Sequence, residues 1–237
     1  MRILFLEHSG FLVETSERYL LFDWWKGEMP PLERNKPLAV FISHGHEDHC
    51  NPAVFTLDDG SREVSFFLGS DIALTPERCG EWSLSLATLR RCRRMAGGES
   101  LTLPDGFMVT ALPSTDEGVA FLVKCGDKTI FHAGDLNWWH WEGEDPAWNL
   151  EMEEKFKTYT IPLRGIRLDL AMLPMDPRLG IAGYLAAAYY LQLCDIRYCL
   201  PMHQWEQFDF TEGFLQKFPQ YRGIVLPICH NAETFEL

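Results

Sequence analysis

The sequence predicts an α+β protein in which two packed, mostly antiparallel β-sheets are flanked by helices. Two observations lead to this fold class. Short apolar or alternating runs, typical of strands, fill two stretches of the chain, and each stretch is followed by segments of helical composition. The hydrophobic share of 46% and the length of 237 residues suit one large core, so we expect a single domain over residues 1–237.

The first strand-rich stretch contains five apolar or β-branched runs bounded by turn residues. The expected strands cover residues 3–6, 10–14, 19–22, 38–42 and 64–68. A polar stretch from residue 76 to about residue 95 has the length of a surface helix, and Ala96-Gly97-Gly98 would end it. This half of the chain therefore predicts one sheet followed by one helix.

The second half repeats this organisation with longer helices. The expected strands cover residues 100–103, 107–112, 119–125, 129–132, 168–174, 198–201 and 224–228, and the expected helices cover residues 183–194 and 212–218. Pro104-Asp105-Gly106 and Gly126-Asp127 are turn sequences between the early strands. These elements supply the second sheet and its helical cover.

Composition narrows the classes of function and partner. A net charge of −13 disfavours nucleic acid, because phosphate contacts need lysine and arginine; we expect the one basic run, residues 90–94, to be a solvated helix face. Seven cysteines without a CxxC pair favour a reducing compartment. No signal peptide and no apolar run long enough to span a membrane are evident. We therefore expect a soluble cytoplasmic protein with no membrane partner.

The densest chemical motif directly follows the apolar run at residues 38–42. Three histidines and two acids fall within six residues, His44-Gly45-His46-Glu47-Asp48-His49. A spacing of two puts His44 and His46 on the same side of an extended chain, where two imidazoles can hold one cation. Asp48 and His49 follow at the turn and face a second position. A merely solvated loop would not explain so many ligand-type side chains.

This motif resembles the HxHxDH signature of the metallo-β-lactamase superfamily. Four further segments extend the resemblance along nearly the whole chain: Leu21-Phe22-Asp23, Phe131-His132-Ala133-Gly134-Asp135, Leu200-Pro201-Met202-His203 and the opening Leu6-Glu7-His8-Ser9-Gly10-Phe11. The opening segment is similar to the lactonase-like branch, the relatives of ascorbate-6-phosphate lactonase. The resemblance implies a four-layer αββα sandwich and a metal-dependent hydrolase.

The resemblance also implies a role for each matching residue. His44 and His46 would bind a first metal, and Asp48, His49 and His203 a second, with Asp135 between them; Asp23 and His8 would support the ligands without binding metal. Asp48 is also expected to act in catalysis. Imidazoles and carboxylates suit one or two divalent ions, with Zn favoured and Mn or Fe as alternatives. Such ions activate water and polarise a carbonyl or phosphoryl oxygen.

One departure from the family pattern affects the first metal. The family supplies a third histidine after the mid-domain hairpin, where this chain reads Leu112-Pro113-Ser114-Thr115-Asp116-Glu117-Gly118. Asp116 could replace the histidine as a carboxylate ligand. The alternatives are a weakened or empty first position, or a contribution from His140.

A tryptophan-rich loop follows the expected bridging ligand Asp135. Its Asn137, Trp138, Trp139 and Trp141 could line a substrate pocket, with His140 as proton donor to a leaving group; the alternatives are packing of the loop and a solvated imidazole. Asp176 and Arg178 could reach the mouth of such a pocket, but we expect an ordinary surface turn there. Cys50 is interpreted as a small buried side chain.

Three functions are compatible with these residues. The favoured one is an enzyme that uses metal-activated water on an ester, lactone, amide or phosphodiester of a small molecule. The missing third histidine favours the second, a metal-binding or sensor protein without hydrolytic activity. RNA processing is the third, and the acidic charge and the absence of an RNA-grasping domain disfavour it.

Overall fold

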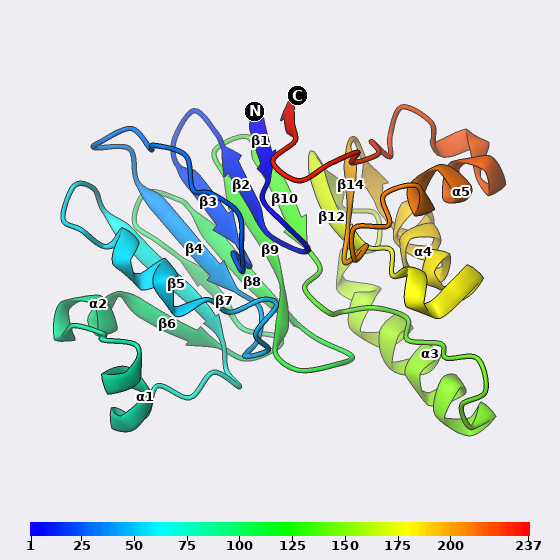
Figure 1. The fold of residues 1–237 in the computed structure, drawn as a ribbon, viewed down its shortest axis with the longest axis horizontal. Coiled ribbons are helices and arrows are strands. Elements are labelled where there is room, and N and C mark those ends of the chain that lie inside the picture. Colours follow the sequence, from blue (N-terminus) through cyan, green and yellow to red (C-terminus); the bar gives the residue numbers. More distant parts are fainter. The chain divides into compact units, whose positions relative to one another are not determined.

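The computed structural model describes every residue from Met1 to Leu237, and the chain divides into two compact units (Figure 1). The first unit comprises Met1–Ala96 together with Asn231–Leu237, and the second comprises Gly97–His230. Each unit contains one large β-sheet. The single-domain organisation expected from the sequence stays a prediction.

The sheet of the first unit has seven strands in the order β15-β1-β2-β3-β4-β5-β6. Their bounds are β1 Arg2–Phe5, β2 Phe11–Glu14, β3 Tyr19–Phe22, β4 Leu38–Ile42, β5 Val64–Gly69, β6 Cys92–Met95 and β15 Thr234–Glu236. The strands from β15 to β3 pair antiparallel, whereas β3 to β6 pair parallel. The five strands expected from the first half are confirmed, and two further strands, β6 and β15, join them.

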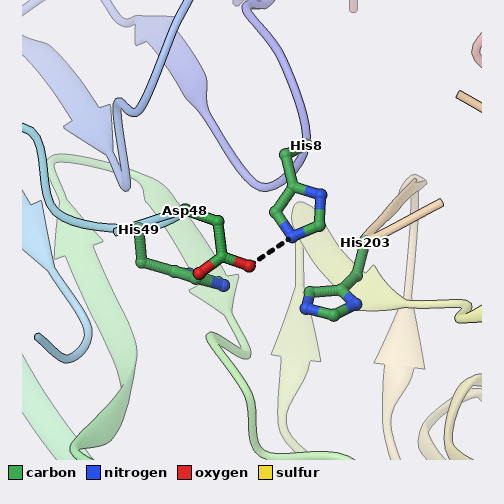
Figure 2. A group of neighbouring side chains, drawn as sticks. All are labelled: His8, Asp48, His49 and His203. Carbon is green, nitrogen blue, oxygen red and sulfur yellow. Dashed lines mark ion pairs between the residues drawn. The ribbon is translucent and has the colours of Figure 1, made fainter. Parts of the chain in front are cut away.

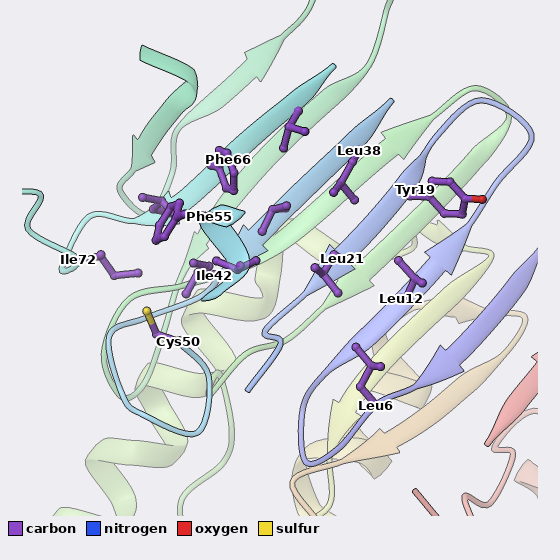
Figure 3. Close-up of a cluster of buried hydrophobic side chains, with 14 residues drawn as sticks. Leu6, Leu12, Tyr19, Leu21, Leu38, Ile42, Cys50, Phe55, Phe66 and Ile72 are labelled. Carbon is purple, nitrogen blue, oxygen red and sulfur yellow. The ribbon is translucent and has the colours of Figure 1, made fainter. Parts of the chain in front are cut away.

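The core of the first unit lies against one face of this sheet (Figure 3). Every residue of β3 and β4 is buried, as expected for central strands of a sheet that is covered on both sides. A short 3-10 helix, η1 (Pro52–Leu57), contributes Val54 and Phe55 to the buried cluster, beside Phe66 of β5. This packing fixes the position of the carboxyl end of β4, and the histidine motif follows directly after it.

The helix expected from residue 76 to about residue 95 is replaced by three short elements. These are α1 (Pro76–Glu81), α2 (Leu86–Arg91) and β6. Ser83 has a left-handed backbone with φ 52°, which ends the first helical segment. The Ser85 side chain then caps the N-terminus of α2, so that a second helix begins there. The basic run consequently spans the end of α2 and the edge strand β6.

The sheet of the second unit has six strands in the order β14-β12-β10-β9-β8-β7. Their bounds are β7 Ser100–Thr102, β8 Met108–Pro113, β9 Val119–Cys125, β10 Lys128–His132, β12 Leu170–Pro174 and β14 Cys199–Met202. β7 to β10 form an antiparallel meander, and β10, β12 and β14 run parallel. A separate two-stranded sheet pairs β11 (Arg167–Leu168) with β13 (Asp195–Ile196).

The helices of the second unit are α3 (Pro146–Thr160), α4 (Leu185–Leu193) and α5 (Phe210–Lys217), with the 3-10 helices η2 (Ile161–Leu163), η3 (Pro177–Tyr184) and η4 (Pro219–Tyr221). The sequence predicts the regions of α4 and α5 but misses α3, which is rich in polar residues. The strand expected at 224–228 is wrong, since only Val225 forms isolated bridges there. None of the helices combines the length and apolar character needed to cross a bilayer.

Candidate metal centre

Ligand-type residues follow the carboxyl ends of parallel strands in each unit. In the first unit Asp23 follows β3 and Ser43-His44 follow β4. In the second unit Asp135 lies three residues after β10, Asp176 two residues after β12, and His203 directly after β14. Parallel strands bring such ends to one edge of a sheet, where ligands of α/β proteins commonly bind. The sequence reading, with mostly antiparallel sheets, did not anticipate these parallel pairings, because isolated strand patterns do not reveal strand direction.

Asp23 organises the histidine loop of the first unit. Its buried carboxylate accepts hydrogen bonds from the Ser43 N–H (2.7 Å), the Ser43 hydroxyl (2.6 Å) and His49 Nδ1 (2.7 Å). Because His49 donates from Nδ1, the neutral ring carries its lone pair on Nε2, which is the form that binds a metal. Asp23 therefore sets both the position and the tautomer of His49.

His44 and His46 converge at their ring nitrogens. The Ser43 hydroxyl lies 2.9 Å from His44 Nδ1, and His44 Nε2 lies 2.9 Å from His46 Nδ1. His44 is buried, whereas His46 is exposed. The two nitrogens are thus close enough to bind one ion.

Two residues outside the motif shape its backbone. The Asp71 carboxylate accepts a hydrogen bond of 2.8 Å from the Gly45 N–H. At Gly69 a Cβ atom would lie 2.2 Å from the Ser43 carbonyl oxygen, so only glycine allows this approach of β5 to the loop. The sequence gives no indication of either role, because both depend on packing between strands.

His8 reaches the same loop from the turn between β1 and β2. Its Nε2 lies 3.3 Å from Asp48 Oδ2, and its ring packs edge-on against His49 with centroids 5.6 Å apart (Figure 2). One ligand atom from each of these three residues lies within 4.8 Å of the other two. His8 has a positive φ of 55°, which is uncommon for a non-glycine residue and is typical of functional or tight-turn positions. The arrangement fits either a supporting role or direct ligation for His8.

In the second unit, Asp135 and His203 face each other. His203 Nε2 lies 3.6 Å from Asp135 Oδ1, and both side chains are buried. Two donors about 2.1 Å from one tetrahedral ion lie about 3.4 Å apart. The separations of the His203–Asp135 pair and of the His8–Asp48 pair are therefore suited to shared ions as well as to direct ion pairs.

Asp176 is the partner of His203 that sequence reasoning missed. Its carboxylate is fully buried and accepts from His203 Nδ1 at 3.0 Å, which leaves Nε2 of the neutral ring as the ligand atom. Arg178 donates to the same carboxylate from Nε (3.0 Å) and Nη2 (2.6 Å). The surface turn expected at Asp176 is wrong, because the Asp-Pro sequence caps the N-terminus of η3 and turns the carboxylate inward.

Asp116 lies near Asp135 in the loop between β8 and β9. A carboxylate oxygen of the exposed Asp116 is within 4.8 Å of one from the buried Asp135. Neighbouring Thr115 holds the turn after Asp135, because its hydroxyl donates to the Asn137 carbonyl (2.6 Å) and accepts from the Asn137 N–H (3.0 Å). The two acids are close enough to share an ion, as the sequence hypothesis requires.

The tryptophan-rich loop divides into residues with different surroundings. Trp138 packs between Phe156 of α3 and Tyr189 of α4, with ring centroids 5.8 and 6.2 Å away. Trp139 instead stacks parallel to Trp141 with centroids 6.3 Å apart. Asn137 is buried and His140 is exposed. The predicted roles of these residues in a substrate pocket and in proton donation stay predictions.

The donor set is chemically suited to a divalent metal. It combines imidazoles with carboxylates, the ligands preferred by Zn, Mn and Fe, and each of His49 and His203 is oriented by a buried carboxylate. Cys50, which directly follows His49, is buried, and burial, followed by the charge of Asp23, raises the pKa of its thiol to about 12. The sequence expectation for Cys50 is a small buried side chain, and its burial agrees with this.

Comparisons with known proteins extend this interpretation to the whole chain. Residues 2–140, more than half of the chain, match the family described as the Beta-lactamase superfamily domain. A metal-dependent hydrolase of Korarchaeum cryptofilum is 26% identical to this chain over the full length of both. Another, from Heliobacterium modesticaldum, is 26% identical over 217 residues, which cover 86% of this chain and 82% of that protein.

Solved structures agree on the fold. A metallo hydrolase from the archaeon Ignicoccus hospitalis aligns with a TM-score of 0.61 at 19% identity, covering 100% of this chain and 98% of that one. The predicted α+β class with two sheets and flanking helices is thereby confirmed, and both sheets are mixed where mostly antiparallel sheets were predicted. By its family match and by its fold, the chain belongs to the metallo-β-lactamase fold superfamily.

Proposed function

We propose that the protein is a metal-dependent hydrolase that acts on an ester, lactone, amide or phosphodiester of a small molecule. The curated relatives, which are named metal-dependent hydrolases, support the class of reaction. A divalent ion at such a site lowers the pKa of water and polarises the oxygen of the scissile group. Zn is the ion we favour, with Mn or Fe as alternatives. The proposed ligands are His44 and His46 at the first position, Asp48, His49 and His203 at the second, Asp135 between them and Asp116 in place of the missing histidine.

One observation carries this proposal: two histidines are each hydrogen-bonded through Nδ1 to a buried carboxylate. The pairs are His49 with Asp23 and His203 with Asp176. A carboxylate that accepts from one ring nitrogen raises the basicity of the ring and aims the other nitrogen outward. Buried charges are costly unless they have such a purpose or partner, so the two pairs are better explained as ligand supports than as incidental core groups.

The other residues supply proton transfer and orientation. Asp48 is half-buried and lies beside His8, so its carboxylate can accept a proton from an attacking water molecule while His8 Nε2 holds it in place. The exposed His140 is our candidate for donating a proton to the leaving group. Asn137, Trp138, Trp139 and Trp141 are proposed to border the substrate pocket.

We propose a small molecule as the partner, and neither nucleic acid nor membrane. A net charge of −13 repels a polyanion at ordinary salt concentration. The net charge already includes the basic run; within that run Arg91 is paired with Asp58, and Arg93 and Arg94 use N–H groups on backbone carbonyls.

A metal-binding protein without hydrolytic activity is the second candidate. It is favoured by the exposure of Asp116, the group proposed to replace the missing histidine at the first position. In that case the second position would still bind metal, but a hydrolase panel would detect no turnover.

Metal analysis and a hydrolase panel test the proposal together. We expect wild-type protein dialysed against zinc to retain metal and to hydrolyse at least one ester, lactone, amide or phosphodiester. His49→Ala and His203→Ala should lose most bound metal and the activity, whereas His230→Ala, at an exposed position, should keep both. Wild-type metal content in both ligand variants contradicts the site, and retained metal without any turnover favours the second candidate.

A further inference from the structure

Arg178 lies over two tryptophan rings of the second unit, those of Trp205 and Trp141. The centre of its guanidinium group lies 4.6 Å from the Trp205 ring centroid and 5.8 Å from that of Trp141. Stacking of this kind immobilises a planar cation without using its N–H groups. The side chain therefore has a fixed position before any ligand arrives.

The hydrogen bonds of Arg178 use only one side of the guanidinium. Nε and Nη2 both donate to the buried Asp176, whereas Nη1 makes no hydrogen bond within the protein. The side chain is 43% exposed. The Nη1 group and the second hydrogen of Nη2 consequently form an open fork, which matches the two oxygens of a carboxylate or phosphate.

These N–H groups of Arg178 lie close to the candidate ligand His203, because both residues bond to Asp176. Asp176 bonds both to Arg178 and to His203, and the rings of Trp139 and Trp205 meet the His203 ring edge-on at 5.9 and 5.6 Å. A molecule that reaches the outer nitrogen of His203 is therefore within reach of the indoles, and through them of Arg178.

The loop that carries Trp205 is conformationally unusual. His203, Trp205 and Glu206 have φ values of 62°, 50° and 60°, in the left-handed region that bulky residues rarely occupy. Trp205 nevertheless stays 38% exposed, although an indole of this size is usually better buried. Such strain persists at sites where it holds a group in position for function.

We propose that Arg178 is a specificity-determining residue that binds an anionic group of the substrate, a carboxylate or a phosphate, while an attached ring lies against Trp205 and Trp141. This inference rests on the proposed function, because it assigns the substrate class of the same site. Although Asp176 balances its charge, the fixed guanidinium still presents outer N–H groups, which a small anion can accept from in a chain of net charge −13.

Binding of simple probes tests this assignment on the zinc-loaded protein. We expect benzoate and phenyl phosphate to bind at least tenfold more tightly than benzyl alcohol, as measured by calorimetry. Arg178→Gln should weaken both anions about tenfold and leave benzyl alcohol unchanged, since the lost contact is a charge-assisted fork. Unequal losses would show whether a carboxylate or a phosphate is preferred.

Two further variants separate recognition from structural support. Trp205→Leu should weaken benzoate more than acetate, because only benzoate has a ring to stack. Arg197→Gln is the matched control, since Arg197 also lies over an aromatic ring, at 5.2 Å from Tyr198, but has no contact with Asp176. It should bind all probes as the wild type does.

Zinc content decides between a direct and an indirect role. The proposal predicts unchanged zinc in Arg178→Gln together with weakened anion binding. Unchanged anion binding overturns it, and so does a parallel loss of zinc and anions, which would mean that Arg178 acts only through Asp176. If anion binding depends on Arg178 but the protein hydrolyses none of the tested substrates, this inference is upheld and the proposed reaction is contradicted.

Discussion

Asp176 illustrates how a buried carboxylate stays ionised. Burial alone opposes the charge of Asp176, but hydrogen bonds from His203 and Arg178 outweigh that cost and hold the pKa of the carboxyl below its ordinary value. Asp23 accepts three hydrogen bonds in the same way. Each carboxylate accepts from, and so orients, one histidine.

The acid stability of the metal-free protein should report on Asp176. Its folded-state pKa is lowered, so its stabilising effect is complete above the ordinary pKa of about 3.9 and is lost as the pH falls through the lower folded value. Urea unfolding should show Asp176→Asn less stable than wild type at pH 7, with the difference shrinking below about pH 4. A constant difference from pH 7 to pH 3 would contradict the lowered pKa.

We predict that the role of Asp116 determines how many metal ions the protein binds. If it replaces the missing histidine, Asp116→His should raise zinc toward two ions per chain, and Asp116→Ala should leave about one, because imidazole is the better zinc ligand. Elemental analysis after dialysis at one fixed pH measures both ratios. Two metals in wild type and an equal ratio in Asp116→Ala would exclude ligation, and Asp105→Ala, in a turn of the same unit, serves as control.

The sequence could predict the histidine motif because its ligands are consecutive, so that local spacing is enough to recognise it. Asp135 and His203 were predicted only through family resemblance. Asp176 and Asp71 were not predicted as supports, because their contacts join segments far apart in the chain. A polar residue that is buried by tertiary packing looks like a surface residue in the sequence.

Among the secondary-structure elements, the buried strands were predicted best. β4 and β12 are apolar at every position, so their pattern does not depend on which face is covered. The failures have local causes: α3 is too polar to show a helical apolar stripe, and β15 has only three residues, none of them buried. Strand direction, which brings the ligand-bearing ends together, depends on the connections and not on the composition.

Gly69 is the element-scale position where substitution should be most informative. Gly69→Ala places a methyl group 2.2 Å from the Ser43 carbonyl oxygen, so β5 and the histidine loop must separate. We expect a loss of about 1–3 kcal/mol in unfolding free energy, as for other overpacked sites, together with weaker zinc binding by chelator competition. At Gly80 in α1 no atom lies within 4 Å of an added Cβ, so Gly80→Ala is the control. It should lower neither the unfolding free energy nor the zinc affinity.

At the scale of the whole molecule, the first unit is completed by residues from both ends of the chain. β15 pairs with β1 through Ile3 and Phe235, and the Phe5 N–H donates to the Glu233 carbonyl at 2.9 Å. One edge strand of the seven-stranded sheet, β15, is therefore far in sequence from its neighbour β1. For this reason the first unit consists of two separate ranges of residues.

Removing residues 231–237 should expose the edge of β1. We expect a loss of about 2–3 kcal/mol in unfolding free energy from the broken strand pairing, and association that increases with concentration, because an unpaired edge recruits other strands. Urea unfolding and size-exclusion chromatography measure the two effects. Glu236→Ala, which removes only an exposed ion pair with Arg2, should have little effect; a monomeric, fully stable truncation would contradict the role of β15.

The pairing of β1 with β15 also brings Met1 and Leu237 into direct contact. The Met1 amino group donates to the Leu237 carbonyl at 2.7 Å, and the Leu237 N–H donates to the Met1 carbonyl at 2.8 Å. A short peptide linker could therefore cyclise the backbone without moving a strand. In the chain-entropy model, closing a loop of 237 residues removes freedom from the unfolded state worth about 5 kcal/mol. A linker between Leu237 and Met1 is thus a natural junction for a circularly permuted variant of residues 1–237, with new termini opened in a surface loop.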